Sequence, residues 1–336
     1  MTHVLAPSRH SAPATARRLL RAVAVLACAP YLTLKAAWLC GSRAGIPDGS
    51  PLLTDDVMLK AINAVTVAMD LSVIVLALLL TRPWGRRVPA WLLVLPMYGA
   101  AGLLTPIMVG FPAQLVLRAV GAGHGGTPVK AAEPFLADWV FRVVYGGFIV
   151  QGLCLGALFA LYARDRWGHL WRGRTGDAGR RARGRGERLP ALAAVALAPL
   201  PLGVHLVWAT GSTIGLPAKI AAARHGEAAV LDAAFVLAAA AAATGLVQFL
   251  RRRGGWGLRT ALLCTAVPSA ALSCWGGWLI VAALTAPDRH DRAATPLMLV
   301  TYAVQVIIGL LVLAAGARYF TRRAAAAPAP APARTR

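Results

Sequence analysis

The chain has 336 residues, of which 58% are hydrophobic and only 14% are charged. Soluble domains are about 45 to 50% apolar and about 25% charged, so this composition excludes a soluble globular protein. The net charge of +22 does not indicate a nucleic-acid partner, because most of the 35 basic residues lie in short stretches between apolar runs. The composition therefore predicts an integral membrane protein whose partner is the lipid bilayer.

Eight apolar runs are long enough to cross a bilayer core of about 30 Å, which takes about 20 helical residues. In chain order they cover residues 19–40, 57–81, 88–109, 135–163, 189–211, 227–250, 258–287 and 295–320. Helices satisfy their own backbone hydrogen bonds, which lipid cannot do. The predicted fold class is therefore all-α: a polytopic membrane helix bundle with eight transmembrane helices.

Three segments outside these runs lack a pattern that could bury a core. Residues 1–16 and the Ala/Pro-rich tail 324–336 are predicted to be disordered. The Arg- and Gly-rich residues 164–188 are predicted to be a cytoplasmic linker. This linker separates residues 17–163 from residues 189–323, so we expect two units of four spans each.

The basic residues between the spans predict the orientation, because cytoplasmic loops carry an excess of Lys and Arg. With the N-terminus in the cytoplasm, 25 Arg residues fall on the cytoplasmic side and 8 basic residues fall outside. Arg-rich and Arg-poor connections then alternate along the whole chain. We therefore expect both termini to be cytoplasmic. The Ala- and Arg-rich composition is typical of a GC-rich genome, so the expected location is a bacterial cytoplasmic membrane.

The two four-span units share a sequence motif at an offset of 170 residues. A Trp, a Gly-Ser pair, a second Gly and a Pro stand at the end of the first span and recur at the end of the fifth. The matched residues are Trp38, Gly41, Ser42, Gly45 and Pro47 in the first unit and Trp208, Gly211, Ser212, Gly215 and Pro217 in the second. Because each unit has an even number of spans, we expect two parallel repeats related by an axis along the membrane normal.

This repeated motif has two interpretations. In the first, the Trp anchors the helix at the outer interface, and the Gly and Pro residues end the helix there. In the second, the motif is a re-entrant turn whose backbone amides and whose Ser42 or Ser212 face a polar ligand.

Among the ionisable residues within the predicted spans, four are candidates for a polar site, namely Lys35, Asp70, Arg142 and His205. A charge at the centre of a span costs about 2.5 to 3.5 kcal/mol on insertion scales, so each needs a partner or a wet cavity. Asp70, in the middle of the second span, is the strongest functional candidate. Helical side chains lean toward the helix N-terminus, which brings Lys35 and Asp70 toward each other. We therefore expect them to form either a structural salt bridge or a substrate or proton site.

The other two ionisable residues have simpler interpretations. Arg142 lies in the outer third of the fourth span, where its long side chain can reach the interface as an anchor. His205 stands where the 170-residue offset places Lys35, and we interpret it as a hydrogen-bonded packing residue rather than a metal ligand. Glu227 and Asp232 open the sixth span, where the helix dipole favours acidic residues.

No motif for phosphate binding, zinc peptidase or dinucleotide chemistry is present, so we expect no cofactor and no metal. Three function classes stay open. The first is a small-molecule or proton-coupled transporter with a polar site inside the bundle, which the duplication and the intramembrane charges favour. The second is a non-catalytic partner subunit or sensor, with partners that the sequence does not identify. The third is a membrane enzyme with an outward-facing site that uses Ser42, Ser212 and His205.

Overall fold

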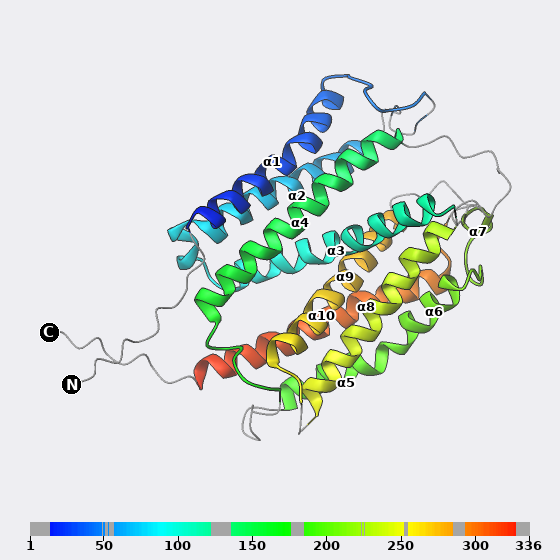
Figure 1. The fold of residues 1–336 in the computed structure, drawn as a ribbon. Helices are drawn as coiled ribbons and strands as arrows, with labels where there is room; N and C mark the ends of the chain where they lie inside the picture. The colour runs from blue at the N-terminus through cyan, green and yellow to red at the C-terminus, as the bar shows by residue number, and fades with distance from the viewer. Residues whose placement is uncertain are drawn as a thin grey trace, which may run out of the picture.

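The computed structural model describes residues 14–48, 50, 53, 57–121, 136–175, 185–222, 224, 226–251, 255–284 and 293–326. Over these residues the fold consists of helices and contains no β-strand (Figure 1). Eight helical segments of the described chain are long and apolar enough to cross a membrane. The prediction of an all-α protein with eight spans is confirmed at this level.

The helices follow the predicted spans in order. They are α1 (Ala14–Leu39), α2 (Val57–Thr81), η2 (Pro83–Arg87), α3 (Trp91–Ala119), α4 (Asp138–Trp167), α5 (Arg185–Leu197), α6 (Pro199–Ala209), α7 (Ala218–Ala222), α8 (Gly226–Leu250), α9 (Leu258–Leu284) and α10 (Pro296–Ala325). The fifth span is interrupted between α5 and α6, where Pro199 has no N–H to continue the helical hydrogen bonds. We call α1 to α4 the first half and α5 to α10 the second half.

Three predicted unstructured segments are shorter than expected. Helix α1 begins at Ala14, α5 begins at Arg185 and α10 continues to Ala325, so each enters a segment that we expected to be disordered or a linker. Hydropathy misses these ends because they are basic or small, although Arg and Ala are good helix formers. Helix α4 likewise continues to Trp167, and the linker is described up to residue 175. Residues 1–13, 176–184 and 327–336 lie outside the described part of the chain.

Helix α3 is longer than predicted, since it continues to Ala119 instead of ending at residue 109. It contains Pro96, Pro106 and Pro112, and a proline removes one backbone hydrogen bond from a helix. A spanning helix tolerates this where a neighbour contacts the freed backbone. Here the Trp275 indole of α9 donates over 3.1 Å to the carbonyl of Leu103, the neighbour of the Gly102 carbonyl that Pro106 leaves without a helical partner.

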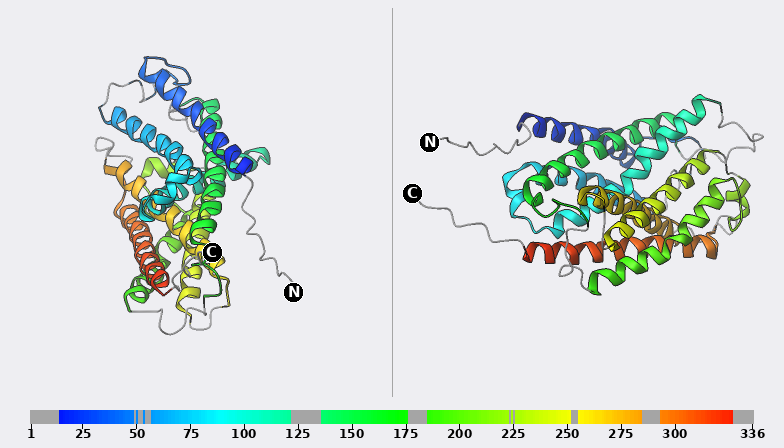
Figure 2. Two further views of the ribbon diagram at one scale, coloured as in Figure 1. Left: turned by 90° about the vertical axis from the view of Figure 1, so that its left-hand side faces the viewer. Right: turned by 60° about the horizontal axis from the view of Figure 1, so that its bottom comes forward.

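Each half packs its first helix against its second and fourth. In the first half α1 contacts α2 and α4, and in the second half the α5–α6 segment contacts α8 and α10. The halves meet through α3, which packs against α9 and α8 and lies between the two groups of helices (Figures 1 and 2). The start of α1 and the end of α10 lie at the same end of the bundle (Figure 1).

The contact between α3 and α9 is close because small residues face each other there. A Cβ atom added to Gly102 of α3 would lie 2.4 Å from the backbone oxygen of Ala270 and 2.5 Å from the Cys274 sulfur. One helical turn earlier, the Tyr98 hydroxyl donates to the Ser269 hydroxyl of α9 over 3.1 Å. A glycine that lets two backbones approach is typical of helix packing in membranes.

Candidate functional site

The predicted pair of Lys35 and Asp70 is wrong. The Lys35 ammonium donates instead to the side-chain oxygen of Asn63, and it lies 5.0 Å from the ring centre of Tyr31 and 5.2 Å from that of Trp38. No ion pair joins Lys35 to Asp70. Asn63 precedes Asp70 by two helical turns, about 10 Å along the α2 axis at 1.5 Å per residue, and it is Asn63 that lies level with Lys35.

Asp70 meets α4 rather than the Lys35 ammonium. Its Oδ1 atom accepts a hydrogen bond of 3.0 Å from the Gln151 side-chain amide, which also donates to the backbone oxygen of Ala27 over 3.2 Å. Both Asp70 and Gln151 are buried. Arg142, also on α4, is exposed on the surface of the bundle.

The Trp-Gly-Ser motif forms the same turn after α1 and after α6. In each copy the Trp indole donates to the backbone oxygen six residues later, over 2.8 Å for Trp38 and 2.9 Å for Trp208. The Ser42 and Ser212 oxygens each accept the backbone N–H two residues later. The serines therefore stabilise their own turns, which favours the interpretation of the motif as a helix end over a ligand-binding re-entrant turn.

The glycines of the motif allow each turn to reverse direction and contact the last helix of its half. Gly41 and Gly211 have φ angles of 87° and 90°, in the left-handed region that glycine adopts most readily. Gly45 and Gly215 follow with φ angles of 73° and 74°. The carbonyl of Gly45 accepts from the N–H of Ala137 before α4, and that of Gly215 accepts from the Thr295 hydroxyl before α10. Pro47 and Pro217 come directly after these contacts, and Pro217 precedes α7.

Substitution of the second glycine of each turn is expected to destabilise the protein more than substitution of the first. A left-handed backbone costs an L-residue about 1 to 2 kcal/mol, which applies equally to Gly41→Ala, Gly45→Ala and Gly215→Ala. Only the last two add a clash, because their Cβ atoms would lie 2.3 Å from Val140 and 2.4 Å from Leu297, whereas nothing lies within 4 Å at Gly41. Thermal unfolding in detergent measures the difference. Equal losses in the three variants would show that contact with α4 and α10 contributes little.

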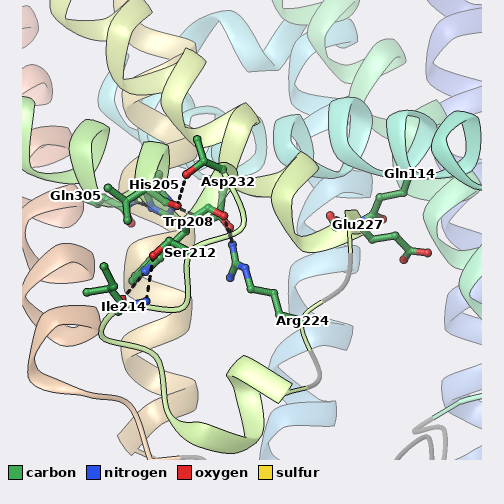
Figure 3. A network of polar contacts seen from close by, with 11 residues as sticks. Gln114, His205, Trp208, Ser212, Ile214, Arg224, Glu227, Asp232 and Gln305 are labelled. Carbon is green, nitrogen blue, oxygen red and sulfur yellow. Dashed lines mark hydrogen bonds and ion pairs between the residues drawn. The ribbon is translucent and has the colours of Figure 1, made fainter. Parts of the chain in front are cut away.

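The second half contains a buried polar network centred on His205 of α6 (Figure 3). The imidazole Nδ1 lies 2.7 Å from Oδ1 of Asp232 on α8, and Nε2 lies 2.7 Å from the side-chain amide nitrogen of Gln305 on α10. The exposed fractions are 3% for His205, 7% for Asp232 and 1% for Gln305. Since the Gln305 amide donates to Nε2, the proton of the neutral imidazole lies on Nδ1 and is donated to Asp232.

Asp232 is shared between two basic groups. Its Oδ2 atom accepts from the guanidinium of Arg224, which precedes α8 and also donates to the backbone oxygen of Trp208 over 3.0 Å. The His205 ring lies between two aromatic rings, with its centre 5.3 Å from that of Trp208 and 5.0 Å from that of Phe235. A carboxylate held by an imidazole and a guanidinium therefore lies inside an apolar bundle.

Sequence reasoning found His205 but missed its partners. Asp232 was explained by the dipole of α8, and Gln305 and Arg224 were not considered. The repeat itself contained a usable signal, because Lys35 contacts Asn63 in the first half, and Asn63 and Asp232 are 169 residues apart. The two halves thus have a polar pair at matching places: an ammonium with an amide in one and an imidazole with a carboxylate in the other.

The geometry does not form the nucleophile and base of a hydrolytic enzyme. Both nitrogens of His205 are engaged by Asp232 and Gln305, while the Ser212 oxygen accepts the backbone N–H of Ile214. Within the described residues, no three His, Cys, Asp or Glu side chains are grouped closely enough to hold a metal ion. What the network can do is bind and release a proton and redistribute the hydrogen bonds of Asp232.

No family model matches this chain, and no curated protein or solved structure shows significant similarity to it. The eight apolar helices define a multi-pass integral membrane protein. Its activity has to be inferred from the buried polar groups themselves.

Proposed function

We propose that this protein is a proton-coupled small-molecule transporter of a bacterial cytoplasmic membrane, in which the His205 network responds to protonation. The observation that supports the proposal is the buried chain of contacts from Gln305 through His205 and Asp232 to Arg224. Ionisable groups inside a membrane bundle are costly, and they mark proton relays and substrate pathways in many transporters.

Protonation of His205 changes which group holds Asp232. A second proton on Nε2 removes its acceptor site, so Gln305 has to turn its carbonyl oxygen toward the ring. The imidazolium then attracts Asp232 more strongly and competes with Arg224 for the same carboxylate. Because Arg224 lies in the connection before α8, its release would free that connection from the Asp232 carboxylate. A contact with two alternative arrangements allows protonation to shift a conformational equilibrium.

The arrangement of the helices supports two further parts of the proposal. The chain consists of two parallel four-helix repeats, which is supported by the matching turns after α1 and α6 and by the packing of α3 against α9, the third spanning helix of each half. Both termini are cytoplasmic, which the excess of Arg on one side supports. Parallel repeats of this kind are found in transporters.

Protonation of His205 can be followed through the fluorescence of Trp208, whose ring lies edge-on to the imidazole. A protonated imidazole quenches a nearby indole. Tryptophan emission should therefore fall as the purified protein is acidified. The fall should be smaller in His205→Gln, because the imidazole beside Trp208 is gone. Any change that remains comes from the other tryptophans. An identical titration in both proteins would exclude His205 as the proton-responsive group.

Transport itself is tested in liposomes that contain the protein and an internal pH dye. Amino acids, sugars, organic acids and organic cations are added outside, one class at a time, and we expect one class to move protons only when the protein is present. The response should be lost in His205→Gln while the variant still purifies as a folded protein. Absence of any response from protein whose fluorescence does titrate would contradict transport and favour the sensor or partner-subunit class.

The orientation predicts that the connection between the halves is cytoplasmic. In a background without native cysteines, Asp177→Cys should not react with an impermeant thiol reagent added to intact cells, because the positive-inside pattern places residue 177 inside. Arg43→Cys, in the exposed turn after α1, is the matched control and should react. The reverse pattern of labelling would show that the protein has the opposite orientation.

A further inference from the structure

The Asp70 carboxyl of α2 is buried without a cationic partner. Its exposed fraction is 3%, and the Gln151 amide is the donor to its Oδ1 atom. The Oδ2 atom is buried and, among the described residues, has no hydrogen-bond partner. This differs from Asp232, whose two oxygens contact an imidazole and a guanidinium.

The groups around Asp70 do not supply a positive charge. On the part of α1 beside Asp70 the titratable residues are Cys28, whose thiol is directed at backbone oxygens; Tyr31, whose ring packs on Phe148; and Lys35, which donates to Asn63. Arg17 and Arg21, nearer the start of α1, donate to Asp165 and Thr81. The titratable side chains of the neighbouring part of α4 are Tyr145 and Cys154, and Tyr98 of α3 is directed to α9. None of the residues beside Asp70 is cationic except Lys35, which lies level with Asn63.

The ionised form of Asp70 is therefore the costly one. A carboxylate that leaves water needs a counter-charge or several donors, and a single amide hydrogen bond compensates only part of that loss. A proton on Oδ2 removes the charge and leaves the Gln151 hydrogen bond to Oδ1 intact. A neutral carboxyl whose Oδ2 has no partner costs less inside the bundle than a carboxylate that accepts one amide hydrogen bond.

We propose that Asp70 is a second proton-binding site, which holds a proton on Oδ2 near neutral pH and releases it in alkaline solution. This site lies in the first half, between α1, α2 and α4, and shares no contact with the His205 network. The inference goes beyond the proposed function, because it stands whether or not His205 couples protons to transport.

Infrared spectroscopy of the full-length protein in detergent tests the proposal. A protonated carboxyl has a C=O stretching band that is separate from the bands of carboxylates and amides. The wild-type protein should show such a band near neutral pH, the band should disappear at alkaline pH, and Asp70→Asn should lack it throughout. Identical spectra of wild type and Asp70→Asn near neutral pH would overturn the proposal, as would a band that persists at alkaline pH.

Stability provides a second readout with an internal control. Asparagine is a neutral isostere of a protonated carboxyl, so Asp70→Asn should leave the thermal midpoint near neutral pH unchanged. The matched variant Asp232→Asn removes an ionised carboxyl from an equally buried place and should lower the midpoint clearly. An equal drop in both variants would mean that Asp70 is ionised in the folded protein.

Occupation by a metal cation instead of a proton is the remaining alternative to exclude. A small alkali ion on Oδ2 would also neutralise the carboxyl, and it would remove the protonated band when added. The infrared measurement is therefore repeated with sodium chloride in place of choline chloride at equal ionic strength. A band that is unchanged by sodium supports the proton site, and a band that sodium abolishes overturns it.

Discussion

Asp232→Asn is expected to destabilise the folded protein by about 3 to 5 kcal/mol, because it leaves the buried charge of Arg224 without a counter-charge. The side chain of Arg224 is only 11% exposed, and its guanidinium contacts Asp232 and a backbone oxygen. The contact with His205 is not the source of this loss, since an asparagine oxygen can still accept from Nδ1. Thermal unfolding of the purified variant in detergent measures the effect.

The double variant Arg224→Gln with Asp232→Asn separates the charge pair from the rest of the network. It removes both charges together, so much of the stability lost in Asp232→Asn should return. The double variant should nevertheless lack the proton movement measured in liposomes, because the carboxylate that His205 and Arg224 share is gone. If the two single losses simply add in the double variant, the ion pair does not contribute to the folded state.

Gly102→Leu is the second change for which we expect a large effect, a loss of about 3 kcal/mol, at the upper end of the usual cost of overpacking. The first side-chain atom would already lie 2.4 Å from the backbone of Ala270, so α3 and α9 would have to separate. Such a separation would also disturb the hydrogen bond of Trp275 to the α3 backbone. The two halves of the protein are held together at this crossing, and thermal unfolding should therefore show the loss.

Gly99→Leu is the matched control for this change. Gly99 lies on the same helix, three residues earlier, and no atom lies within 4 Å of the Cβ position there. The helix propensity gained by replacing a glycine is the same in both variants, so the difference between them reports the contact between α3 and α9. Similar stability of the two variants would show that this crossing is loose in the protein.

Local features of the chain were sufficient to predict most of the helices. Each spanning helix coincides with an apolar run of about the length that a bilayer requires, and α2 begins and ends at the predicted residues. The hydropathy window ended the third span at residue 109, whereas α3 continues through Pro112 to Ala119 beside α9.

The candidate site was only partly accessible to the same reasoning. His205 was identified because it is a rare residue type inside a span, and its place in the repeat was visible from Trp208. Its interpretation as a packing residue depended on its partners, which lie 27 and 100 residues further along the chain. Lys35 and Asp70 differ in depth by about two helical turns, and the lean of their side chains does not bridge that distance, so Lys35 contacts Asn63 at its own level.

The sequence by itself determined that this is a helical membrane protein, because hydropathy over about 20 residues and the placement of Arg are local properties of the chain. The tertiary structure decided which polar groups are paired. Lys35 contacts Asn63 rather than Asp70. Asp232 contacts His205 and Arg224 and does not only stabilise the N-terminus of α8 through the helix dipole. These outcomes depend on the register and crossing of neighbouring helices, which follow from close approach at residues such as Gly102 and not from the properties of any single span.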